Sequence, residues 1–169
     1  MQLYINEALK RVGETFAFQA DEQLPDQEYG TRELQFLSPA TVKGEYTFNG
    51  KAFTVTANVK VSLHSVCARC NEPFDEELSF NFSERFIRQT AQEDEESYRY
   101  GGDAIVLNEA IMDNLFLQLP LVSICREDCK GLCPTCGVNR NFEQCDCCNV
   151  APNNAFAVLL ERQNEYKEV

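Results

Sequence analysis

The chain has 169 residues, 44% of them apolar, which suits one compact domain with an appendage. It carries 15 Lys and Arg against 27 Asp and Glu, and the resulting formal charge of −12 disfavours the sequence-independent phosphate attraction that nucleic-acid binders use. This acidity favours a protein or another basic molecule as the partner.

The N-terminus shows no basic stretch followed by an apolar run, and nowhere do about 18 apolar residues follow one another. We therefore expect a cytoplasmic protein that is neither exported nor inserted in a membrane. Nine cysteines in such a chain do not indicate a disulfide framework, because a reducing compartment keeps thiols reduced and an odd number leaves one unpaired. Metal ligation is the leading interpretation.

Residues 1–90 are predicted to form an antiparallel β-domain. Apolar and polar residues alternate without interruption from Phe53 to Leu63, which is typical of a long half-buried strand. A second alternating run extends from Phe74 to Phe86. The two runs should pair as a hairpin, with Cys67 and Cys70 in its turn.

Two further strands are expected upstream, one around Leu34 and Phe36 and one from Val42 to Phe48. The second should turn at Asn49-Gly50, since Asn-Gly favours the positive φ of a type I′ turn. A meander of at least four strands would result. The predicted fold class is α+β, with an antiparallel sheet or a partly closed barrel.

The rest of the chain divides into a linker and a Cys-rich half. Residues 91–104 are acidic and punctuated by glycine, so we expect a linker there. Within residues 105–169, apolar residues recur at helical spacing over 108–118, and this helix should end at Pro120 and lie on the sheet. A zinc-ribbon-like segment should follow, and then a short C-terminal helix around 156–160.

The cysteine spacing suits chelation. Two thiolates separated by two residues can bind one tetrahedral ion, with sulfur at roughly 2.3 Å from zinc. In the pair at 133–136 the following residue, Gly137, is predicted to take a positive φ. A redox Cys-x-x-Cys instead opens a helix in a βαβ context, which neither pair here has, so a free reactive dithiol is the weaker alternative.

We expect about two Zn²⁺ per chain, because eight soft ligands without other redox groups form closed Cys₄ sites. Four cysteines after the helix could close one local site, which leaves the other four for a site that joins the hairpin turn to the chain leaving the helix. With four thiolates bound, neither ion keeps an open position, so the predicted role is architectural. The fourth ligand of the local site is either Cys147 or Cys148. The predicted ligands are Cys67, Cys70, Cys125 and Cys129 in the long-range site, and Cys133, Cys136, Cys145 and Cys147 in the local one.

His64 is the only histidine, and it falls on the polar face of the first long strand. We interpret it as a solvated strand residue rather than as a hydrogen-bond donor near the site. Hydrolases and thiol enzymes need an activated nucleophile with a base beside it, and one histidine scarcely allows that pairing. We therefore expect no enzymatic activity.

The order of motifs resembles the YceD family from about Glu33 to the terminal helix. The resemblance rests most on the Cys67–Cys70 pair and on Cys-Lys-Gly-Leu-Cys-Pro-Thr-Cys-Gly at 129–137. It implies a role in accumulation of the large-subunit ribosomal RNA, with no reaction assigned. Some members keep the first cysteine pair and lack the second cluster, which supports a division into two sites. The doubled Cys147-Cys148 departs from the commoner ending.

Direct RNA binding would need Lys and Arg gathered on one face, yet Arg126, Lys130 and Arg140 stand among acidic residues. Eight bound thiolates carry more negative charge than two Zn²⁺ neutralise, so metal binding would make the chain more acidic. We therefore predict a basic ribosomal or ribosome-assembly protein as the partner. An RNA-binding zinc ribbon is the alternative, and a thiol redox protein a weaker one. The sequence leaves the oligomeric state open.

Overall fold

A computed structural model describes residues 1–29, 32–90 and 97–149 of the chain. The C-terminal helix expected around residues 156–160 lies outside these described residues. Within them, no helix is both long and apolar enough to cross a membrane.

The described chain forms two compact units. The first, which we name the sheet unit, takes residues 1–68 and 72–127. The second, the Cys-rich unit, takes residues 69–71 together with the chain from residue 128 onward.

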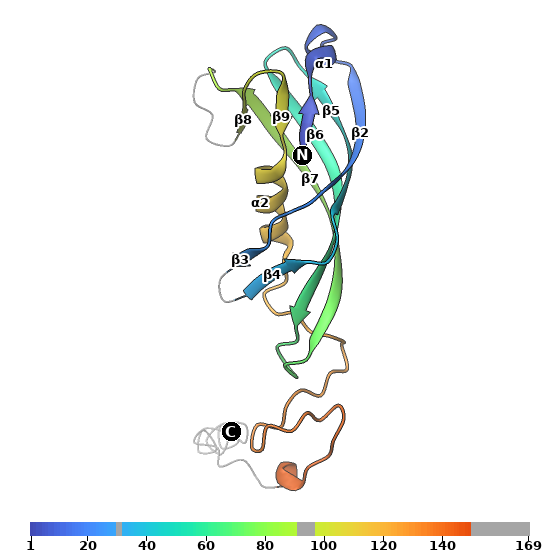
Figure 1. Cartoon of the computed structure of the whole chain (residues 1–169), viewed down its shortest axis with the longest axis vertical. Helices are drawn as coiled ribbons and strands as arrows, with labels where there is room; N and C mark the ends of the chain where they lie inside the picture. Colours follow the sequence, from blue (N-terminus) through green and yellow to red (C-terminus); the bar gives the residue numbers. More distant parts are fainter. Residues whose placement is uncertain (30–31, 91–96, 150–169) are drawn as a thin grey trace, which may run out of the picture. The chain divides into compact units, whose positions relative to one another are not determined.

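The sheet unit is built around one long hairpin. Strand β6 (Ala52–Val66) pairs antiparallel with β7 (Pro73–Arg88) along its whole length. Every second side chain of β6 enters the core, because successive residues of a strand face opposite sides of a sheet. Figure 1 shows the two strands running and twisting together. The hairpin predicted from the two alternating runs is confirmed. The buried core residues of β6 include Phe53, Val55, Val59, Val61 and Leu63.

The other edge of β6 is shared by two strands. β5 (Ala40–Phe48) pairs with the first half of this edge, and β2 (Thr15–Glu22) pairs with β5. Further along the same edge β6 pairs with β4 (Arg32–Phe36), which in turn pairs with β3 (Gln27–Tyr29). The predicted meander is therefore wrong at β4, which pairs with β6 and not with β5, the next strand in the chain.

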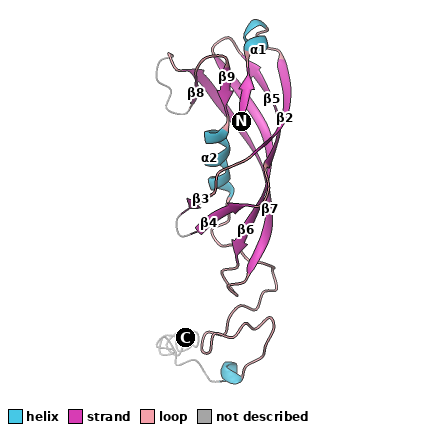
Figure 2. Cartoon of the chain, in the orientation of Figure 1, coloured by secondary structure: helices cyan, strands magenta, loops and turns pink. Residues whose placement is uncertain are grey.

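The seven-stranded sheet is open and mostly antiparallel, as Figure 2 shows. Its path runs from β2 through β5 and β6 to β4 and β3, with β7 and then β8 on the other side of β6. Of the two predicted alternatives, an antiparallel sheet or a partly closed barrel, the sheet is confirmed, and the described strands do not form a closed barrel. The physical reason is that β5 and β4 share one edge of β6, so the sheet branches at that edge and its outer strands do not meet.

The turn between β5 and β6 is not the predicted type I′ turn. A type I′ turn requires a positive φ at both central residues. Here Gly50 has a φ of +91°, but the φ of Asn49 is not positive. Asn49 acts through its side chain instead. Its Oδ1 accepts hydrogen bonds from the backbone N–H of Lys51 at 3.0 Å and of Ala52 at 2.9 Å. The Asn-Gly pair thus makes the turn through a side-chain cap.

The predicted acidic linker is only partly described. Residues 91–96 lie outside the described part, and the stretch after them contains β8 (Tyr98–Tyr100), which runs parallel to β7. The next strand, β9 (Ala104–Val106), pairs with β1 (Gln2–Tyr4), and α1 (Asn6–Lys10) follows β1. Strands of three residues carry too little periodicity to be predicted from the sequence.

Helix α2 (Asn108–Gln118) has the bounds that its apolar spacing predicts. The residue after the helix, Leu119, has an extended conformation with a ψ of 130°. The helical region is disfavoured there because Pro120 follows. The buried residues of the helix belong to the same core cluster as Phe53 of β6, so α2 lies on the sheet as predicted (Figure 1). The core residues of α2 are Ala110, Ile111, Met112 and Leu115.

The described part of the Cys-rich unit contains little regular secondary structure. Leu132 and Asn139 form an isolated antiparallel bridge, and Asp146–Asn149 form the 3₁₀ helix η1. Between residues 128 and 149 there is a single bridge in place of the paired strands of a ribbon. The zinc-ribbon likeness therefore stays a prediction.

Candidate metal centres

The first Cys-x-x-Cys pair lies in the turn of the long hairpin. The last strand pair, Val66 with Pro73, brings the two ends of this turn together. Inside it, the backbone N–H of Cys67 donates to the carbonyl oxygen of Glu72 at 2.9 Å. Asn71, directly after the second cysteine, has a φ of +58°, a left-handed conformation that asparagine tolerates better than most residues. The turn thus closes tightly around the cysteine pair.

The second pair, at 133 and 136, has the same backbone form. The N–H of Cys133 donates to the carbonyl oxygen of Val138 at 2.8 Å, again five residues further on. Gly137, directly after the second cysteine, has a φ of +75°, which confirms the prediction for this residue. One loop geometry therefore occurs at two separate places in the chain, and each time it surrounds two thiols.

Eight cysteines come together in two groups of four. Within each group the four Sγ atoms all lie within 4.8 Å of one another. Four thiolates around one zinc ion, each at roughly 2.3 Å in a tetrahedron, stand about 3.8 Å apart, so both groups fit a Cys₄ site. The first group is Cys67, Cys70, Cys125 and Cys129, and the second is Cys133, Cys136, Cys145 and Cys147.

This grouping is the one that the spacing of the cysteines predicts. Cys147 supplies the fourth sulfur of the second group, and the side chain of the adjacent Cys148 lies outside the described part of the chain. Both groups can hold a metal ion by their donor chemistry, because thiolate sulfur is a preferred ligand of zinc. That the ion is zinc stays a prediction.

The two groups differ in exposure. In the first group Cys67, Cys70 and Cys129 are buried, with 0%, 3% and 5% of their surface exposed. In the second group Cys133 is buried too, at 3%, but Cys136 is exposed, and Cys145 and Cys147 are half-buried. An ion in the first group would therefore be shielded from solvent, and one in the second could be reached from it.

Backbone amides favour the thiolate form at Cys133. Hydrogen bonds from the backbone of Cys136 and Thr135 lower the pKa of Cys133 to about 6. The opposite holds for Cys145, whose hydrogen bond to Cys133 and whose burial raise its pKa to about 12. The hydrogen bonds in this group thus favour the thiolate form at Cys133 and the thiol form at Cys145. A divalent cation favours the deprotonated form of all four.

Gly131 of the Cys-Lys-Gly-Leu-Cys run has a physical reason to be glycine. Its φ is +71°, and a Cβ atom there would lie 2.9 Å from the carbonyl oxygen of Arg69. That same oxygen accepts a hydrogen bond from the N–H of Leu132 at 2.8 Å. The Arg69 guanidinium in turn donates to the carbonyl oxygen of Cys129 at 3.3 Å. Cys129 and the chain that follows it are therefore held against Arg69, the residue that precedes Cys70.

Asn141 is a supporting residue that the sequence analysis missed. Its Nδ2 donates to Cys129 Sγ at 3.4 Å, and its Oδ1 accepts from the N–H of Lys130 at 2.9 Å. Asn139 Oδ1 accepts a second hydrogen bond from Asn141 Nδ2, at 2.8 Å, and fixes the orientation of this side-chain amide. Hydrogen bonds to a ligand sulfur orient it and stabilise its charge. The only signal in the sequence is the pair of asparagines two residues apart.

A buried polar contact holds the chain that leads to Cys125. Glu76 Oε1 accepts hydrogen bonds from the hydroxyl groups of Ser65 and, at 3.1 Å, of Ser123. Both serines are buried, and the Ser123 carbonyl oxygen accepts from the N–H of Ala68 at 3.0 Å. Since buried polar groups are costly unless paired, these bonds fix the segment before Cys125 beside the hairpin turn.

His64 lies on β6 and pairs with a residue across the hairpin. Its Nδ1 is 2.9 Å from Asp75 Oδ1, and 39% of its side chain is exposed. This agrees with the interpretation of a solvated strand residue. His64 lies in neither cysteine group.

Replacing Asn71 by alanine should destabilise the first loop, because alanine in the left-handed region costs about 1–2 kcal/mol. Replacing it by glycine should leave stability within about 0.5 kcal/mol of the wild type. Chemical denaturation of the two variants measures the difference. Equal stability of both would mean that the conformation of this residue does not matter to the loop.

Comparison with known proteins assigns the chain to a family. A family model described as "Large ribosomal RNA subunit accumulation protein YceD" matches residues 55–161, a range that contains all eight grouped cysteines. The chain belongs to the YceD family. The resemblance inferred from the cysteine motifs is thereby confirmed.

Two kinds of relative are similar to this YceD-family chain. An uncharacterised protein of Mycobacterium tuberculosis is 37% identical over 90 residues, which cover 50% of this chain and 43% of the relative. The chloroplastic "Large ribosomal RNA subunit accumulation protein YCED homolog 1" of Arabidopsis thaliana is 23% identical over 164 residues, which cover 78% of this chain and 51% of the relative. The chain thus spans about half the length of the curated relatives it matches. No solved structure matches it.

Proposed function

We propose that this protein is a non-enzymatic zinc-binding factor that supports accumulation of the large ribosomal RNA, and that it acts through a basic protein partner in the cytoplasm. The family match over residues 55–161 carries this proposal, because it encloses both cysteine groups. The printed name of the Arabidopsis relative points to the same process.

Zinc is the ion that suits these groups best. Soft thiolate ligands in a tetrahedral set are typical of structural zinc, and four of them leave no open position for water or substrate. Each ion would then hold chain segments together without taking part in a reaction. The first would close the long segment between Cys70 and Cys125, and the second a short loop between Cys136 and Cys145.

An architectural role agrees with the side chains available for catalysis. Thiol and serine enzymes activate their nucleophile with an adjacent base, which is most often a histidine. The single histidine of this chain is instead paired with Asp75 on the polar side of the β6–β7 hairpin. We propose on this ground that the protein catalyses no reaction.

The charge of the chain favours a protein partner over direct RNA contact. At a formal charge of −12 the chain repels phosphate, while basic ribosomal proteins are attracted to it. The effect on ribosomal RNA would then be indirect, through assembly of a protein that binds the RNA.

Binding measured over a salt series should separate the two modes. Affinity for purified basic proteins of the large ribosomal subunit should be strong at low salt, where unscreened charges act over about 30 Å at 0.01 M, and should weaken as salt rises. Affinity for fragments of the large ribosomal RNA should be weak throughout. Tight RNA binding with a steep salt dependence would instead support the RNA-binding zinc ribbon.

A further inference from the structure

The outer side of α2 carries apolar residues that the core does not use. Leu117 is 79% exposed, and Leu121 and Val122, in the segment just after the helix, are 96% and 55% exposed. The opposite side of the helix is already packed, with Ile111 and Leu115 at 0%. Three large apolar side chains within six residues thus face solvent, and exposed apolar patches of this kind are characteristic of interaction sites.

The path of the chain keeps these side chains outside. Helix α2 ends at Leu119, which is extended because Pro120 follows it. Leu119 is itself buried and anchors this end of the helix in the core. The next residues therefore leave the helix axis and carry Leu121 into solvent, with Leu117 four residues earlier on the outer side.

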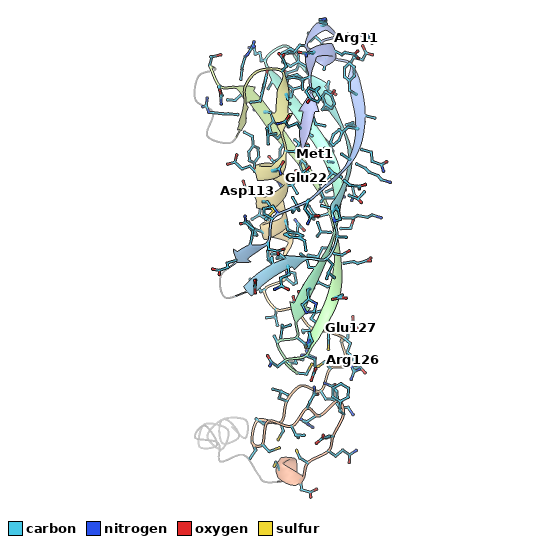
Figure 3. The ribbon with its side chains drawn as sticks, in the orientation of Figure 1. Met1, Arg11, Glu22, Asp113, Arg126 and Glu127 are labelled. Atoms are coloured by element: carbon cyan, nitrogen blue, oxygen red, sulfur yellow. The ribbon has the colours of Figure 1, made fainter. Side chains whose placement is uncertain are left out.

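The same side of the helix becomes acidic toward its N-terminus. Glu109, Asp113 and Leu117 are spaced four residues apart and so form one stripe along α2. Figure 3 labels Asp113, which accepts a hydrogen bond from the hydroxyl of Tyr98 at 2.9 Å. Burial, the hydrogen bond to Asp113 and the carboxylates of Asp113, Glu84 and Glu109 raise the pKa of Tyr98.

No positive side chain interrupts this stretch of sequence, since residues 100–125 contain neither Lys nor Arg. The stripe is therefore acidic at Glu109 and Asp113 and apolar at Leu117, and the exposed Leu121 and Val122 follow in the segment after the helix. Such a surface is complementary to a segment with basic residues at one end and apolar residues at the other. It repels RNA phosphate and would bring like charges together in a pairing of two copies of this chain.

We propose that this stripe of Glu109, Asp113 and Leu117, together with Leu121 and Val122 in the segment just after the helix, docks a basic amphipathic segment of a protein partner. The inference rests on the proposed function, for which it names the contact surface and the chemistry of the partner. The apolar half supplies affinity through burial, and the acidic half sets the orientation and speeds association.

A labelled synthetic peptide tests the surface directly. The probe is a 16-residue helix-forming peptide with Lys spaced four apart in one half and Leu in the other, titrated into the zinc-loaded full chain by fluorescence anisotropy. The double variant Leu117→Ser, Leu121→Ser should bind about tenfold more weakly, because central apolar contacts dominate the binding energy. The double variant Glu109→Gln, Asp113→Asn should lose about threefold at low salt and nothing at high salt.

Matched controls separate the stripe from the overall charge. Val12→Ser removes an apolar residue that is 61% exposed elsewhere, and Glu14→Gln removes an exposed carboxylate outside the stripe. Both should bind the peptide like the wild type. Equal losses in the controls and the stripe variants, or no loss in the stripe variants, would overturn the proposal. Displacement of the peptide by a 20-nucleotide RNA would overturn it in favour of RNA.

A test in cells distinguishes this inference from the proposed function. In a strain that lacks its own YceD protein, the wild-type chain should restore the large ribosomal RNA, and the Leu117→Ser, Leu121→Ser variant should fail at normal protein level and zinc content. Full restoration by this variant would overturn the stripe and leave the proposed function intact. Failure of the wild-type chain to restore the RNA would count against the proposed function, whatever the peptide result.

Discussion

Replacing Cys70 by serine should destabilise the whole sheet unit, whereas replacing Cys136 should have a smaller and more local effect. A zinc ion held by the first cysteine group would close the chain between residues 70 and 125, which includes β7, β8, β9 and α2. By the chain-entropy estimate used for cross-links, a loop of this length contributes about 4 kcal/mol, and a much shorter one less. Thermal or chemical unfolding measures the difference, and each variant should keep about one zinc ion.

The matched control is Cys148→Ser, which removes the cysteine that the proposed pairing leaves unused. This variant should keep both ions and wild-type stability. Loss of an ion from it would mean that Cys148, and not Cys147, completes the second site. If Cys70→Ser and Cys136→Ser change stability equally and each loses both ions, the proposed division into two sites is wrong.

A chelator should remove the two ions in separate phases. The second group exposes Cys136 to solvent, while three of the four sulfurs of the first group are buried. Release from the buried group requires local opening, and an extra opening cost of only about 1.4 kcal/mol makes release roughly tenfold slower. Absorbance of a zinc indicator should therefore show one fast and one slow equivalent.

The cysteine variants assign the two phases of zinc release. Cys136→Ser should abolish the fast phase and keep the slow one, and Cys70→Ser should do the reverse. A single phase with two equivalents, or loss of the fast phase in Cys70→Ser, would show that exposure does not govern release.

The long hairpin could be predicted because its pattern is continuous. Alternation from Phe53 to Leu63 leaves one choice of buried face, and the strand that forms, β6, exceeds the alternating run by only a few residues at its end. Helix α2 could be predicted for a similar reason, since its apolar spacing covers three turns and Pro120 marks its end.

Other elements depend on contacts that the sequence pattern does not contain. β2 does alternate, through Phe16, Phe18 and Ala20, and this signal could have been used, although its inward side chains are only half-buried. The parallel pairing of β8 with β7 and the position of β4 beside β6 have no local signal. They follow from how the rest of the chain packs, so periodicity alone could not give them.

The grouping of the cysteines followed from spacing, while the residues that support them did not. The four cysteines between 133 and 147 could close one short loop, which left Cys67, Cys70, Cys125 and Cys129 for the other group. The spacing did not decide between Cys147 and Cys148 as the fourth ligand of the loop. Asn71 could have been found by comparison with Gly137, because both follow the second cysteine of a pair. Asn141 could not, since its role depends on a side-chain hydrogen bond to Cys129.

Metal content is the most direct test of the central claim that both cysteine groups hold zinc. The full chain should be purified under reducing conditions without added metal and measured by elemental analysis beside a thiol titration. We expect about two zinc ions per chain, with most thiols unreactive until a chelator is added. A metal-free protein with all nine cysteines titratable and with its stability unchanged by zinc would contradict it.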